Sequence, residues 1–119
     1  MTETSTSWQR RERSRDLTGL GRLEAEIMRV VWDKGEVTVR DVYEELRLRR
    51  RIAYTTVMSV LRNLHAKGLV AQDRSASAYV YRATVSDRDV AFGILQTVVE
   101  TIMGGETAPL IEYLDGYGS

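Results

Sequence analysis

The chain of 119 residues contains no cysteine, one proline and one histidine. Without cysteine the protein cannot form disulfides, a thiolate zinc site or a thiol redox centre, and nothing in the composition points to secretion. No apolar stretch approaches the ~20 residues that a membrane-spanning helix requires. The arginine-rich N-terminus also lacks the apolar core of a signal peptide. We therefore expect a cytoplasmic protein that does not insert into a membrane and uses no cofactor or metal.

Residue patterns typical of catalysis are also missing. His65 is the only histidine, and no carboxylate pair or nucleophile at a suitable spacing accompanies it. The segment Gly19-Leu20-Gly21 has no preceding strand and lacks the complete glycine spacing of a phosphate-binding loop. The sequence therefore predicts that the protein is not an enzyme.

The formal net charge is zero, but the charges are divided unevenly along the chain. Residues 1–83 carry 16 Lys and Arg against 11 Asp and Glu, whereas residues 84–119 carry one basic side chain, Arg88, against six acidic ones. This asymmetry indicates a half that binds a polyanion, joined to a half with another task. A run of like charges is also typical of a merely solvated face.

Hydrophobic periodicity predicts a mainly α fold with a small β-hairpin. Apolar residues at three- and four-residue steps predict three helices, and alternation then predicts a hairpin. A fourth helix begins after a capping Ser86 and ends at Gly104-Gly105, before a short closing helix. The expected ranges are 20–34, 39–49 and 53–67 for the first helices, 69–83 for the hairpin, 87–103 for the fourth helix and 107–114 for the last.

This order of elements is typical of a winged helix–turn–helix followed by C-terminal dimerisation helices. We expect a flexible basic arm over residues 1–18, a DNA-binding domain over 19–83 and a helical dimerisation arm over 84–119. Two interpretations of the N-terminal arm are open, since such an arm either contacts a DNA backbone or minor groove or is a disordered tail.

In a winged helix–turn–helix, the second helix of the pair enters the major groove. The third predicted helix presents polar side chains away from its apolar stripe, and these are Thr55, Thr56, Ser59, Arg62 and Asn63. Hydroxyl groups bond phosphates or bases, and arginine or asparagine donates to base edges. The preceding cluster of Arg49, Arg50 and Arg51 would add attraction to phosphates that does not depend on sequence.

Two further residues allow two interpretations each. Tyr54 either contacts a phosphate through its hydroxyl or packs in the core. Arg74, at the tip of the hairpin, either reaches the adjacent DNA backbone or minor groove or is a solvated turn residue.

A fold alone does not determine function, and winged-helix domains also act as protein–protein interaction modules in other proteins. Such a module is the alternative interpretation of this chain. Such a module would carry apolar or acidic residues on the third helix. The polar and basic surface found there favours double-stranded DNA as the partner.

The fourth helix is apolar over a face too broad for a helix lying alone on a small domain. This pattern predicts the principal interface of a homodimer, and a two-fold dimer predicts a palindromic operator. The interface residues would be Val90, Ile94, Leu95, Val98, Val99, Ile102 and Met103.

Several segments resemble the penicillinase and methicillin-resistance repressors of the BlaI/MecI type, over about residues 17–115. The resemblance implies a repressor that binds inverted repeats as a homodimer of winged-helix domains joined by C-terminal helices. In family members the operator half-sites resemble TACA and TGTA. The segments that carry the resemblance are Leu23–Met28 with Val31-Trp32, Tyr54–Leu64, Lys67–Val70 and Tyr79–Tyr81.

The same resemblance implies that a membrane sensor of β-lactams triggers proteolysis within the dimerisation region, so that a regulatory protease or a membrane sensor would be a further partner. Glu112-Tyr113 stands where the family pattern has an Asn-Phe pair, so the chain departs from the pattern at the cleavage point. Family members usually continue beyond the position of Ser119 into another helix, and we expect a smaller dimer interface here. The absence of cysteine excludes the metal site of the copper-responsive branch.

Overall fold

The structure is a computed structural model that describes residues 19–74 and 77–118. The predicted basic arm, residues 1–18, lies outside the described residues, as do residues 75–76 at the hairpin tip. The described residues divide into two units, one ending at Val85 and one beginning at Ser86.

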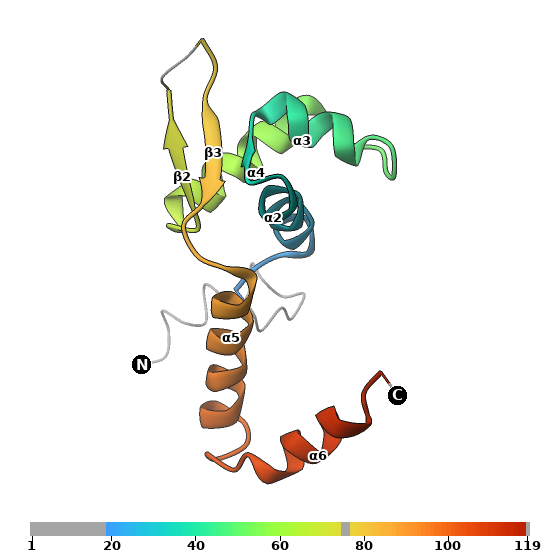
Figure 1. The fold of residues 1–119 in the computed structure, drawn as a ribbon, viewed down its shortest axis with the longest axis vertical. Coiled ribbons are helices and arrows are strands. Elements are labelled where there is room, and N and C mark those ends of the chain that lie inside the picture. The colour runs from blue at the N-terminus through green and yellow to red at the C-terminus, as the bar shows by residue number, and fades with distance from the viewer. Residues whose placement is uncertain (1–18, 75–76, 119) are drawn as a thin grey trace, which may run out of the picture. The chain divides into compact units, whose positions relative to one another are not determined.

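The elements follow the predicted order (Figure 1). The mainly α winged helix–turn–helix expected from the sequence is confirmed, with each predicted helix and the hairpin present. The first unit contains α2 (Arg22–Lys34), β1 (Glu36–Val37), α3 (Val39–Leu46), α4 (Tyr54–Ala66), β2 (Val70–Asp73) and β3 (Val80–Ala83), and the second contains α5 (Asp87–Thr101) and α6 (Ala108–Gly116).

The core of the first unit forms where the apolar stripes of three helices meet one face of a small sheet. Burial of these side chains is the main force that holds the helices together, at roughly 25 cal/mol for each Å² of apolar surface removed from water. Because α4 contributes only one stripe to this core, its opposite face stays in solvent. The buried residues are Ile27, Met28, Val30 and Val31 of α2, Val42 and Leu46 of α3, Val57, Leu61 and Leu64 of α4, and Val37, Val70 and Tyr81 of the strands.

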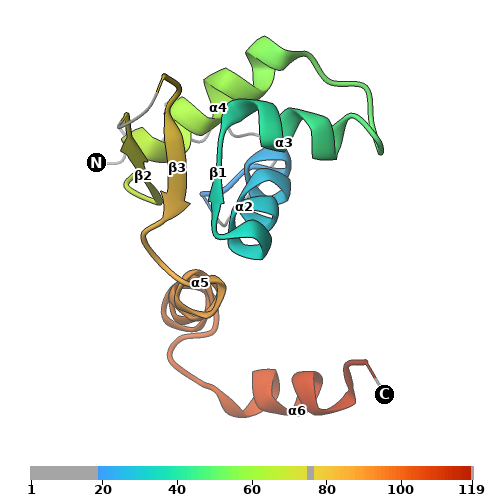
Figure 2. The same cartoon turned by 45° about the horizontal axis from the view of Figure 1, so that its top comes forward.

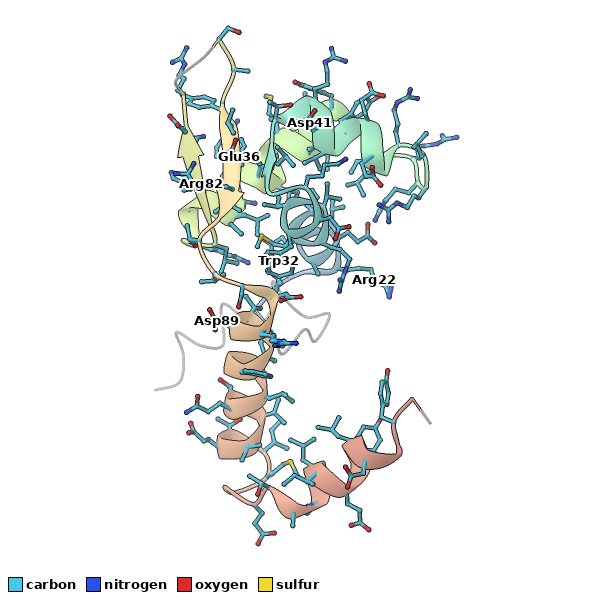
Figure 3. The ribbon with its side chains drawn as sticks, in the orientation of Figure 1. Arg22, Trp32, Glu36, Asp41, Arg82 and Asp89 are labelled. Carbon is cyan, nitrogen blue, oxygen red and sulfur yellow. The ribbon has the colours of Figure 1, made fainter. Side chains whose placement is uncertain are left out.

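The sheet has three strands rather than the two of the predicted hairpin. Its order is β1-β3-β2, and both pairs are antiparallel. Figure 2 shows β1 lying between β3 and the helices α2 and α3. Val37 of β1 pairs with Tyr81 and is buried, while Glu36 pairs with Arg82 on the exposed side (Figure 3). A strand of two residues is too short to show a period of two in the sequence.

Three predicted helix ends are wrong. The last helix, α6, runs to Gly116 rather than to residue 114. α3 ends at Leu46 rather than at residue 49, because the Leu46 carbonyl accepts hydrogen bonds from the amides of both Arg49 and Arg50 and so closes a tight turn. α5 ends at Thr101, which leaves Ile102 and Met103 in the turn that follows it rather than in the helix.

Capping interactions determine where the helices begin. Thr38 Oγ1 accepts from the Asp41 amide at 3.1 Å, and the Asp41 carboxylate accepts from the Thr38 amide at 2.9 Å. This reciprocal pair satisfies two backbone donors at the start of α3. In the second unit, Ser86 Oγ accepts from the Asp89 amide at 3.0 Å, which confirms the predicted cap of α5.

The second unit has no buried side chain in either of its helices. Within residues 19–74 and 77–118, no helix combines the length and the apolar character that crossing a membrane requires.

Candidate nucleic-acid interface

The exposed face of α4 carries the five polar side chains that the sequence assigns to DNA. Thr55, Thr56, Ser59, Arg62 and Asn63 are all exposed. The buried stripe lies on the other side of the helix, since residues three and four apart share a face. α4 contains no acidic residue, so its outer face combines hydroxyl, amide and guanidinium groups without a carboxylate.

Tyr54, at the start of α4, packs against a neighbouring helix without entering the buried core. Its ring meets that of Tyr43 in α3 edge to face, with the centroids 5.5 Å apart. The residue nevertheless keeps 41% of its surface exposed. Tyr54 therefore packs α4 against α3 and leaves part of its side chain in solvent, and its contact with a phosphate stays a prediction.

A groove of about 460 Å³ lies between α4, the start of α3 and the β2–β3 hairpin. Its walls include Tyr54, Met58 and Tyr79, and Arg40 and Arg62 also line it. No acidic residue is among its lining residues. Apart from Tyr54 and Arg62, these residues were not predicted, because the groove exists only once the hairpin folds beside α4.

The hairpin, or wing, places a cation beside an aromatic ring. The Arg74 guanidinium carbon lies 5.1 Å from the centroid of the Tyr79 ring, a cation–π contact across the two strands. Arg74 is exposed and directly follows β2. The guanidinium of Arg74 is therefore not merely solvated, because it packs against the Tyr79 ring. Contact of Arg74 with DNA stays a prediction.

The turn between α3 and α4 contains the predicted arginine cluster, and the structure gives two of its three members a carboxylate partner. Arg49 lies 3.2 Å from Glu45, and Arg50 lies 2.8 Å from Glu26. Arg51 has no ion pair within the described part of the chain. The predicted phosphate contacts of this cluster stay predictions.

Arg47, two residues before the cluster, also pairs with a carboxylate. Its Nε donates to Glu44 Oε1 at 2.8 Å, and this hydrogen bond raises the pKa of the Arg47 guanidinium above its usual value. We call Arg47, Arg49 and Arg50 the turn arginines. The spacings Glu45–Arg49 and Glu44–Arg47 are visible in the sequence as helical i,i+4 and i,i+3 pairs, whereas the pair of Glu26 and Arg50 spans 24 residues.

The apolar residues predicted for dimerisation lie half-buried or exposed in the second unit. Val90, Ile94, Leu95, Val98, Val99 and Met103 are half-buried, and Ile102 is exposed. The sequence reasoning missed further exposed apolar side chains of this unit, which are Phe92, Ile111, Tyr113, Leu114 and Tyr117. Exposed apolar surface of this extent is typical of an interaction site.

The fold and the polar helix surface define a winged helix–turn–helix protein. The profile of the penicillinase repressor family matches residues 20–114. The chain belongs to the penicillinase repressor family, a family of transcription regulators, and the predicted resemblance is confirmed.

Known relatives agree with this assignment. The transcriptional regulator BlaI of Mycobacterium tuberculosis, in strains CDC 1551 / Oshkosh and ATCC 25618 / H37Rv, is 36% identical over 106 residues, which cover 87% of this chain and 77% of the relative. The methicillin resistance regulatory protein MecI of Mammaliicoccus sciuri is 20% identical over 82 residues, which cover 69% of this chain and 67% of that protein.

Proposed function

We propose that the protein represses transcription by binding palindromic operator DNA as a homodimer, with α4 of each protomer in the major groove. The observation that carries this proposal is the exposed face of α4, which is polar and basic and contains no carboxylate. The opposite face of the helix is buried in the core, which fixes the position of α4. A rigid helix with such a face is suited to base edges, where each well-placed bidentate contact discriminates by ~1–3 kcal/mol.

Residues on this face have distinct roles in the proposal. Arg62 and Asn63 donate to base edges or phosphates, and Ser59 and Thr55 bond phosphates or bases through their hydroxyls. The methyl group of Thr56 packs against thymine methyls. Arg51 adds attraction to phosphates from the turn before α4.

The groove beside α4 seats one strand of the duplex backbone in this arrangement. Arg40 and Arg62 line the groove, whose wall contains no acidic residue. Arg62 has no carboxylate partner among the described residues and is the better placed of the two for a phosphate, because Arg40 lies 3.5 Å from Glu44 outside the wall. Tyr79 lines the groove and also packs against Arg74, which would extend the contact to the wing. These residues position the protein on the duplex, whereas the outer face of α4 reads bases.

The homodimer rests on the unpartnered apolar surface of α5. Val90, Ile94 and Val98 lie at four-residue spacing along one side of this helix. A two-fold dimer presents two copies of α4 to successive major grooves about 34 Å apart, so the half-sites would be about 10 base pairs from centre to centre.

Release by a membrane sensor and a regulatory protease is proposed from the family resemblance. The pair at the position of family cleavage, Glu112-Tyr113, lies inside α6. Cleavage there would require α6 to open locally, because a protease binds its substrate as an extended strand.

The protein would act in the cytoplasm, where its DNA target lies.

A pair of arginine substitutions tests the proposal. Arg62→Ala removes a guanidinium from the face of α4, and Arg29→Ala removes one from the exposed surface of α2, so both variants lose the same charge. Binding to a duplex with an inverted TACA/TGTA repeat is measured by fluorescence anisotropy at constant salt. We expect Arg62→Ala to weaken binding about tenfold or more, and Arg29→Ala to weaken it far less. Equal effects of the two substitutions would contradict the assignment of α4 as the reading helix.

A further inference from the structure

Two neighbouring carboxylates of α3 hold basic side chains that a DNA duplex would also attract. Glu44 accepts from Arg47 at 2.8 Å and lies 3.5 Å from Arg40. Glu45 lies 3.2 Å from Arg49. Each carboxylate therefore already has an arginine partner in the protein without DNA.

A third pair ties the same turn to α2. Arg50 donates to Glu26 Oε1 at 2.8 Å, and Lys34 of α2 shares Glu45 at 3.8 Å. These pairs join segments that are distant in the sequence. Moving Arg50 onto a phosphate would therefore also remove a link between the turn and α2.

The local charge balance separates the turn from the rest of the proposed interface. The stretch Arg40–Arg51 contains five arginines but also three acidic side chains. Arg62 and Arg74, by contrast, have no carboxylate partner among residues 19–74 and 77–118. An arginine without an acidic partner gains a full charge pair when it meets a phosphate, whereas a paired arginine first has to give one up.

We propose that Glu44, Glu45 and Glu26 keep the turn arginines on the protein when it binds DNA, so that other arginines neutralise the phosphates. The inference rests on the proposed DNA binding and assigns the three carboxylates a role in it. They limit the number of phosphate contacts, and with it the affinity for DNA of any sequence and the dependence of binding on salt.

The double variant Glu44→Gln/Glu45→Gln tests this role. Glutamine keeps the size of the side chain but removes the charge, so Arg47 and Arg49 are released. Arg40 and Lys34 lose the more distant of the contacts to the same two carboxylates. Binding to a duplex of scrambled sequence is measured over a range of salt concentrations. Each turn arginine that reaches a phosphate steepens the log–log slope by about 0.9, so Arg47 and Arg49 together give at least about 2 per protomer, and affinity at about 0.1 M salt should rise more than tenfold.

The variant Glu106→Gln serves as the matched control. It removes one exposed carboxylate from the second unit, where Glu106 has no ion pair with any described residue. Its slope should equal that of the wild-type protein. If Glu106→Gln steepened the slope as much per charge as the double variant, net charge and not the release of arginines would be the cause, and the proposal would fall.

A second readout follows Arg47 in the complex itself. Its Nε–H resonance, assigned by its disappearance in Glu44→Gln, should keep its position and its slow exchange with water when wild-type protein binds the duplex. A resonance that shifts on binding, or a slope unchanged by the double substitution, would overturn the inference while DNA binding stands. If the wild-type protein bound no duplex at low salt, the proposed function would fall first and this inference with it.

Discussion

Substituting Leu61 tests whether the buried stripe of α4, rather than the ion pairs on the surface, holds this helix in place. Leu61 is 0% exposed, in the core between the helices. Truncation to alanine removes its apolar contacts and leaves a cavity, which costs ~2–5 kcal/mol. The stability of a domain of this size is only ~5–15 kcal/mol, so Leu61→Ala should remove a large fraction of it.

The chain offers a matched control in Leu48, which lies in the turn after α3 and is 75% exposed. Leu48→Ala makes the same chemical change where little apolar surface is buried, and should alter stability by less than about 0.5 kcal/mol. Urea unfolding is followed by circular dichroism. With a urea dependence of ~1–3 kcal/mol per M, Leu61→Ala should lower the midpoint by about 1–3 M. Similar midpoints for the two variants would refute the reasoning.

The remaining predictions concern a helix cap, the dimer and the operator. Thr38→Ala removes the acceptor for the Asp41 amide and should lower the free energy of unfolding by about 1 kcal/mol, and an unchanged urea midpoint would show that the cap contributes nothing. Ile94→Asp places a charge on the proposed dimer face and should give a monomer by light scattering, whereas a dimer would place the interface elsewhere. Inserting about half a helical turn of DNA between the half-sites should abolish most specific affinity at constant salt, because one half-site rotates to the opposite face of the duplex. Retained affinity would mean that the dimer is flexible or that one protomer suffices.

The sequence predicts the longer helices well because each carries an apolar period over several turns. The stripe Val57, Leu61 and Leu64 locates both the buried and the exposed side of α4, so the candidate reading residues follow from spacing alone. The same reasoning cannot find β1, because Glu36 and Val37 form a strand only by pairing with residues about 45 positions later in the chain.

The groove and the pairing of the turn arginines show the same limit. Arg40 and Tyr79 meet in one groove through the tertiary fold, and no local pattern links them. The pair of Arg50 with Glu26 likewise depends on the packing of α2 against the turn. A cluster of arginines in a sequence therefore predicts attraction to DNA only after its partners are known.

Hydroxyl-radical footprinting on the promoter region beside the protein's own gene tests the central claim most directly. The wild-type protein should protect two tracts on one face of the duplex, about 10 base pairs apart from centre to centre. The variant Ser59→Ala/Arg62→Ala should lose both tracts at the same protein concentration and salt. Uniform protection without discrete tracts, or protection that survives this change to α4, would contradict the assignment of α4 as the helix that reads an operator.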